Sequence, residues 1–183
     1  MDADRAATAA DRIDRKLRSE SVVWLSSVSP DGTPHLVPIW FSWDGETVLI
    51  ASKPHAKKVA NLRTNPSVML ALGEPEDDFD VGMVEGVAEL LDEPARVVLP
   101  ASHLAKYRSE MAAIGLTADE FVATYSQVIR VRPTRFLPWH GRTTRSPDAL
   151  SVRVDRRIAA AVSRVAASVR SSAAPARRAL GAA

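Results

Sequence analysis

The sequence predicts a mainly β domain with flanking helices, an α+β chain whose six short strands form a closed or partly closed antiparallel barrel. Runs of β-branched and aromatic residues alternate with turn residues across residues 21–132. The first three runs are joined by short turns, Pro30-Asp31-Gly32 and Asp44-Gly45, a spacing typical of an antiparallel meander. Helical stretches are inserted between these short strands, which favours a barrel over a βαβ sheet.

The individual elements follow from local patterns. Ile13 and Leu17 lie four residues apart among charged residues, which predicts a first helix over residues 2–19. Thr117 followed by Glu120 forms a capping box, with Leu116 and Phe121 as its hydrophobic staple, and predicts another helix start. The remaining predicted helices are residues 56–64 and 94–111, and the predicted strands are residues 21–29, 34–43, 46–52, 67–72, 81–91 and 127–132.

The chain divides into two parts by composition. We expect residues 1–142 to form the barrel domain with its N-terminal helix, and residues 143–183 to form a basic tail rich in Ala and Arg. Residues 142–183 contain nine arginines and two aspartates, so a total net charge of +2 leaves −5 on residues 1–141. An acidic body argues against nucleic acid as a partner.

Within the tail, apolar residues from Val154 to Val169 recur at helical spacing, which predicts one helix followed by a disordered end. The helix needs a surface on which to pack, and the acidic body is our preferred partner. The alternatives are peripheral contact with an anionic membrane and a mostly mobile tail.

The composition also indicates the cellular compartment of the protein. The chain has no cysteine, so it has no disulfide and no thiolate metal site. No apolar run approaches the roughly 20 residues of an integral membrane segment. The charged N-terminus lacks the apolar centre of a secretory signal. We expect a cytoplasmic protein.

The stretch from Ala51 to Pro66 contains the most informative charges. Lys53, Lys57 and Lys58 lie around a predicted helix start, with His55 between them and no acidic residue in the same stretch. Cations oppose the helix dipole there, and an anion such as a phosphate would account for them. A solvated basic turn is the alternative interpretation.

Two further features interrupt the expected pattern. Pro38 stands in the middle of an apolar strand, where it cannot donate a ladder hydrogen bond. This indicates an edge strand or a bulge, or backbone groups left free to contact a planar ring. Trp139 and Arg142 follow the last strand, where they could cover a ligand or simply pack. The four histidines show no paired metal-ligand spacing, so we predict no metal site, and we name no catalytic residue.

Taken together, the motifs GTPHLVPIWF, KKVANLRTNPSV and RPTRFLPWHGR resemble the pyridoxamine 5′-phosphate oxidase-like family, and most of all its coenzyme F420-dependent subclass. The resemblance covers roughly residues 12–142. It implies a six-stranded antiparallel split β-barrel of the FMN-binding type, a homodimer, and cofactor sites between the two subunits. The C-terminal arginine pattern of true pyridoxamine phosphate oxidases is missing, which argues against vitamin B6 oxidation.

The resemblance also implies cofactor-binding residues. The phosphate would lie against the cations of the third strand and the helix after it, near Ser52 and Asn61. The ring would lie along two strand segments, and two residues would approach from the partner subunit. The full implied set is Val37, Pro38, Ile39, Trp40, Ile50, Ala51, Ser52, Lys53, Lys57, Lys58, Asn61, Trp139 and Arg142.

The function implied is an F420-dependent oxidoreductase that transfers hydride between the deazaflavin and a small organic substrate. The alternatives are the same enzyme class using FMN and a non-catalytic protein that binds or carries a flavin or deazaflavin. A haem-binding relative is a further alternative, against which the lack of an evident axial ligand argues.

Overall fold

The computed structural model describes residues 2–73, 81–139 and 152–153. The helices are α1 (Asp2–Ser19), α2 (Lys57–Thr64), α3 (Ala95–Val98), α4 (Ala101–Lys106), α5 (Arg108–Ala113) and α6 (Ala118–Thr124). The strands are β1 (Val22–Val28), β2 (Pro34–Trp40), β3 (Ser42–Trp43), β4 (Val48–Ser52), β5 (Ser67–Leu72), β6 (Val81–Leu91), β7 (Gln127–Trp139) and β8 (Val152–Arg153). The tail helix predicted beyond Val154 and the acidic stretch 74–80 lie outside the described residues.

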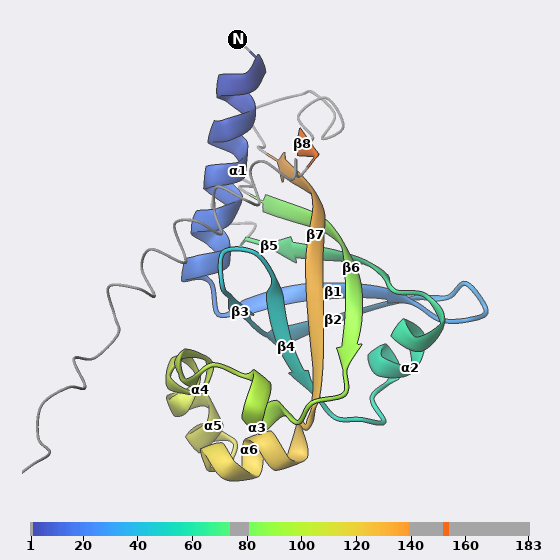
Figure 1. Ribbon diagram of the computed structural model, residues 1–183, viewed down its shortest axis with the longest axis vertical. Helices are drawn as coiled ribbons and strands as arrows, with labels where there is room; N and C mark the ends of the chain where they lie inside the picture. Colours follow the sequence, from blue (N-terminus) through green and yellow to red (C-terminus); the bar gives the residue numbers. More distant parts are fainter. Residues whose placement is uncertain (1, 74–80, 140–151, 154–183) are drawn as a thin grey trace, which may run out of the picture.

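One curled antiparallel sheet runs through the molecule, in the order β2-β1-β5-β6-β7-β4-β3, with β8 paired to β7 (Figure 1). β2 and β3 stand at opposite ends of this order although only Phe41 separates them in the chain. The sheet therefore curls until its two edges meet at Phe41. This confirms the predicted split barrel with flanking helices.

The break at Phe41 corrects the predicted number of strands. The run 34–43 is divided into β2 and β3, so the strand path described above has seven strands rather than six. The meander also ends there: β1 pairs with β2, whereas β4 pairs with β3 and β7.

The side chain of Tyr107 forms hydrogen bonds with the backbone at this break. Its hydroxyl accepts a hydrogen bond from the Phe41 backbone N–H at 3.0 Å. The same hydroxyl lies 2.7 Å from the carbonyl oxygens of Phe41 and Ser21, and its one hydrogen can be donated to either. A backbone bend inside a protein loses ladder hydrogen bonds, and Tyr107 replaces them.

The core has two parts. Residues such as Leu25, Ile50 and Ile129 fill the barrel, and α1 and α2 close it. A second cluster joins the helices α3–α6 to the outer face of β4 through Leu49. β4 is therefore buried on both faces, and its side chains alternate between the two clusters. Figure 1 shows α3–α6 gathered at the end of β4, well apart from α2.

The predicted helix 94–111 is wrong in detail, because the structure has three short helices, α3, α4 and α5. Pro100 ends the first of them, since a proline disfavours helical backbone at the residue before it, and Leu99 is extended with φ −69° and ψ 128°. Thr117 does cap α6, and both hydrogen bonds of the predicted capping box with Glu120 are present.

β7 is longer than the predicted sixth strand. It extends to Trp139 and pairs with β6 along its length, with a register shift between Glu85 and Gly86. Among the described residues, no helix has the length and apolar character needed to cross a membrane.

Candidate functional site

A pocket of about 480 Å³ lies where the barrel meets the helices α5 and α6. Residues of β2, of the end of β4, of the turn after β4, of the start of α2 and of the helical segment line it. The lining residues are Pro38, Ile39, Trp40, Ala51, Ser52, Lys53, His55, Ala56, Lys58, Ile114, Phe121 and Tyr125. The volume lies within the range of about 300–1,000 Å³ that small-molecule and cofactor sites occupy.

The pleat of β2 determines which of its side chains lie on the outer face of the barrel. Pro38 and Trp40 lie on the outer face of the barrel, because side chains two residues apart in a strand share a face. In the described sheet β2 pairs with β1 alone, so Pro38 sits on an edge strand. A missing N–H is tolerated at an edge, which accounts for this proline.

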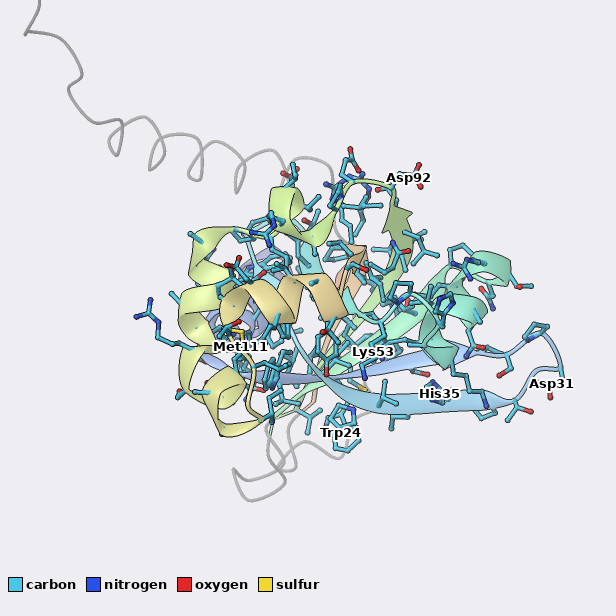
Figure 2. All side chains as sticks on the ribbon, turned by 90° about the horizontal axis from the view of Figure 1, so that it is seen from below. Trp24, Asp31, His35, Lys53, Asp92 and Met111 are labelled. Atoms are coloured by element: carbon cyan, nitrogen blue, oxygen red, sulfur yellow. The ribbon has the colours of Figure 1, made fainter. Side chains whose placement is uncertain are left out.

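Two lysines and a histidine also line the pocket: Lys53, Lys58 and His55. Lys58 is half-buried, and burial lowers its pKa from the ordinary lysine value. Among the side chains that the structure describes, no carboxylate forms an ion pair with Lys58 or with Lys53. A half-buried ammonium without a counter-charge is costly, and an anionic ligand would stabilise it. Figure 2 shows Lys53 between α2 and the helices of residues 95–124.

Lys57 behaves differently from Lys58. It is exposed and does not line the pocket. The positive charge of Lys57 helps to lower the pKa of Asp31, which lies in the turn between β1 and β2. The pKa of Asp31 is lowered mainly by the hydrogen bonds from Thr33, and Lys57 makes a smaller contribution. The basic cluster seen in the sequence is thus divided between the pocket and a solvated turn.

Aromatic side chains form the wall next to the helices. Trp40 stacks on the buried ring of Tyr107, with centroids 4.9 Å apart and planes 7° apart. Phe121 lies 5.8 Å from Trp40 and 4.8 Å from Tyr125. Lys53 approaches the Tyr125 ring at 5.6 Å, which is a cation–π distance. Cations and aromatic rings thus both line the pocket, and they meet where Lys53 lies over Tyr125.

The sequence analysis did not predict the pocket residues of the helical segment, which are Ile114, Phe121 and Tyr125. Phe121 and Tyr125 lie four apart, which places them on one face of α6 and its C-cap. That spacing is a weak signal, because a buried helix face shows the same pattern. Ile114 has 54% of its surface exposed, an unusual fraction for a large apolar side chain, but only the structure shows this exposure.

Seven of the residues implied by the resemblance line this pocket, whereas Val37, Ile50, Lys57 and Asn61 do not. Ile50 points into the barrel core and is fully buried, and Val37 packs against the same core. Asn61 is buried and donates a hydrogen bond to Ser27 Oγ at 3.0 Å. Trp139 pairs through its backbone with Val81, and its side chain lies outside the described part of the chain, as does Arg142.

The arrangement is suited to binding rather than to acid–base chemistry on its own. The described pocket has cations for an anionic group, an aromatic wall for a planar group, and no carboxylate. Such a site fits a ligand that combines a flat ring with a phosphate.

The comparisons with known proteins identify chains of similar fold. A solved structure named F420 reductase shares 27% identity with a TM-score of 0.52, and the match covers 67% of this chain and 94% of that one. A conserved hypothetical protein from Mycobacterium tuberculosis shares 27% identity with a TM-score of 0.58, over 72% and 84% of the two chains. A putative pyridoxamine 5′-phosphate oxidase from Listeria innocua, at 22% identity, TM-score 0.53 and 70% and 96% coverage, shows the same fold.

No curated protein sequence matches the chain significantly. The family model described as pyridoxamine 5′-phosphate oxidase matches residues 9–140, which span β1 to β7, the helices between them and the C-terminal part of α1. The chain therefore belongs to the pyridoxamine 5′-phosphate oxidase family.

Proposed function

We propose that this protein is an F420-dependent oxidoreductase that transfers hydride between the deazaflavin and a small organic substrate. Lys58 supports this most strongly, since it is a half-buried cation in a pocket, with a lowered pKa and no carboxylate partner among the described residues. A phosphate ester supplies the negative charge that this lysine lacks. Lys53 lines the same pocket and adds positive charge for longer anionic tails.

The residues present fit the proposed cofactor. The phosphate would be held by Lys58 and Lys53, near the buried Ser52. The ring would lie along Pro38 to Trp40, against Ala51. When bound in its reduced form, the deazaflavin supplies the hydride. The chain's own residues bind the phosphate, orient the ring on Trp40 and keep water from one face of it.

The preference for F420 over FMN rests on two lines of support. The sequence motifs resemble the F420-dependent subclass, and a solved structure with 27% identity is named F420 reductase. Both cofactors combine a tricyclic ring with a phosphate, so the same pocket features would serve either.

We also propose that the protein works as a homodimer. The outer face of β1, β2, β5 and β6 exposes large apolar side chains: Val22 at 39%, Trp24 at 45%, Leu36 at 58% and Val87 at 45%. Several large apolar side chains exposed on one sheet face are typical of protein interfaces. Trp24 lies opposite Pro38 in the β1–β2 pair, so a partner subunit on this face would also border the pocket. Figure 2 shows Trp24 projecting outward from these strands.

The test is to purify the protein and identify any bound cofactor by absorbance, fluorescence and mass. F420 and FMN are then titrated into cofactor-free protein, and oxidation of the reduced cofactor is followed with a panel of quinones, enones and nitro compounds. We expect tighter binding of F420 and turnover with at least one acceptor. Tighter binding of FMN would contradict the choice of cofactor, and binding without any turnover would favour a carrier. Binding of neither cofactor would refute the proposal.

A further inference from the structure

We propose that residues 92–126, which hold the helices α3–α6, open from the barrel as one unit, and that His103, Lys106 and Tyr107 attach this helical unit in a way that acid pH weakens. Three residues of the helical unit line the pocket. Opening therefore removes one wall of the pocket and releases what the pocket holds. This opening is a property of the chain without any ligand, so it is independent of the proposed function.

The topology lets the helical unit move without breaking the sheet. The chain leaves β6 after Leu91 and enters β7 at Gln127, and Leu91 pairs with Val128 across these two strands. The two ends of the helical unit are therefore held together by the pairing of β6 with β7. Figure 1 shows the four helices gathered at one end of the sheet. Contiguous units of this kind commonly open at a lower free energy than the whole fold.

The helical unit also has a hydrophobic core of its own. Its buried side chains form a cluster separate from the one that fills the barrel. Most of the buried members of this cluster, such as Met111 and Phe121, belong to the helical unit itself. The strands add Leu49, Leu91 and Val128. Opening would thus expose this cluster and leave the barrel core intact.

Lys106 and Tyr107 attach the helical unit to the backbone of the barrel. The Lys106 ammonium donates to the carbonyl oxygens of Glu20 and Phe41, and it lies 4.4 Å from the centre of the Phe41 ring. The Tyr107 hydroxyl contacts the backbone of Phe41 and Ser21. These partners lie just before β1 and just after β2, so the polar attachment is concentrated at one place.

His103 makes this attachment sensitive to pH. Its ring is fully buried, with the ring centres of Tyr107 and Phe121 at 5.1 Å and 6.1 Å. Nδ1 lies 3.1 Å from Ser42 Oγ, whereas Nε2 is buried with no hydrogen-bond partner among the described residues. A protonated imidazole has two N–H donors, so one of them would stay unpaired while the helical unit is closed.

The charges near His103 add to this cost. Burial, and then the positive charge of Lys106, lower the pKa of His103. The carboxylate of Glu20 acts on Lys106 instead, and that of Glu110 acts on Tyr107. Opening lets water solvate the imidazolium, so protonation favours the open state. His103 therefore stabilises the closed state fully above pH 6.5, and this contribution is lost as the pH falls toward about 4.

Hydrogen exchange of the full chain without added ligand, corrected for intrinsic rates, tests the separate opening. At pH 7.5 we expect the amides of α4–α6 to exchange faster than those of β5. Val84→Ala weakens the barrel core and should speed exchange in β5 roughly tenfold while leaving α4–α6 unchanged. Met111→Ala, the matched change in the helical core, should speed exchange in α4–α6. Equal acceleration of both regions in Val84→Ala would show that they open only together, and would overturn the proposal.

Lowering the pH from 7.5 to 5 tests the role of His103. The opening constant of α4–α6 should rise roughly tenfold to thirtyfold in the wild type, as the lowered pKa of His103 requires. His103→Asn does not titrate and should show a far smaller rise. His55→Asn is the matched control, because His55 is exposed and lies outside the helical unit, and it should respond as the wild type does. An equal rise in His103→Asn and the wild type overturns the role of His103. If His103→Asn fails to fold, an unchanged opening constant in the wild type overturns it.

Discussion

Tyr107 links three parts of the molecule through one side chain. Its hydroxyl satisfies the backbone at Phe41, its ring supports Trp40 in the pocket wall, and it lies in the helical cluster between α4 and α5. Burial raises the pKa of Tyr107 to about 12, so the hydroxyl keeps its hydrogen at any physiological pH. The closure of the barrel and the shape of the pocket therefore depend on the same residue.

Tyr107→Phe should separate these two roles. The ring remains and still stacks on Trp40, but the Phe41 N–H and carbonyl lose a partner in a buried place. We expect a loss of about 1–3 kcal/mol in the free energy of unfolding, which is the cost of an unsatisfied buried polar group. Urea denaturation measures it. An unchanged midpoint would show that other groups satisfy the bend.

His103 makes the stability depend on pH. It is fully buried, with Nδ1 3.1 Å from Ser42 Oγ, and burial lowers its pKa to about 4, assisted by the charge of Lys106. The unfolded chain binds a proton at this histidine below the ordinary histidine pKa of 6.5, whereas the folded chain does so only below about 4. The contribution of His103 is therefore complete above pH 6.5 and is lost as the pH falls toward 4.

The expected loss across this window is up to about 3 kcal/mol from His103. Urea midpoints at pH 7.5 and pH 5 measure the part of this loss between pH 6.5 and pH 5, which is about 2 kcal/mol. His103→Asn keeps a hydrogen-bonding group for Ser42 but does not titrate, so its stability should change less between the two pH values. An equal change in the variant and the wild type would assign the pH dependence to other groups.

At the scale of elements, β6 and β7 leave no room for a side chain at Gly86, beside the register shift of their pairing. A Cβ at Gly86 would lie 2.6 Å from Val131 Cγ1 and 2.9 Å from the Arg132 carbonyl oxygen. Gly86→Ala should therefore cost about 1–3 kcal/mol, as for an overpacked core. At Gly82 the nearest atom, Ile13 Cγ1, is 3.3 Å away, so Gly82→Ala should cost less. Thermal melting compares them, and an equal loss would contradict the difference in packing.

The elements whose causes are local were the ones that the sequence could predict. The capping box at Thr117 and the turn glycines act within a few residues, and the structure has α6 and both hairpin turns where they were expected. The break at Phe41 has no such local cause. It depends on closure of the sheet and on Tyr107, which lies 66 residues away in the chain.

The same distinction applies to the site. Lys58 and Trp40 could be proposed from their own strands and turns. Ile114 and Tyr125 reach the pocket only because α5 and α6 pack against β4, and no local pattern predicts that contact. Conversely, Ile50 and Ala51 are neighbours in one strand, and a motif spanning both does not tell which one faces a ligand. The pleat of β4 in the structure places Ala51 at the pocket.

For the whole molecule, the exposed apolar face of the sheet predicts self-association. Trp24→Glu places a charge in the middle of that face and should convert a dimer into a monomer of 19.8 kDa. Val97→Glu is the control, because this exposed apolar residue lies on α3, away from the sheet face. Light scattering gives the masses. A wild-type chain that is monomeric with cofactor bound would contradict the proposed dimer.

The central claim is that the pocket holds the phosphate of a flavin or deazaflavin against Lys58. Calorimetric titration of F420 and FMN into the Lys58→Ala and Lys57→Ala variants tests this claim most directly. The two lysines are adjacent in the chain, yet Lys58 lines the pocket and Lys57 is exposed and acts on Asp31. Loss of a charge-assisted contact of about 1.5–3 kcal/mol should weaken cofactor binding roughly tenfold to hundredfold in Lys58→Ala. Lys57→Ala should bind nearly as the wild type does. Equal affinities in both variants and the wild type would contradict the account.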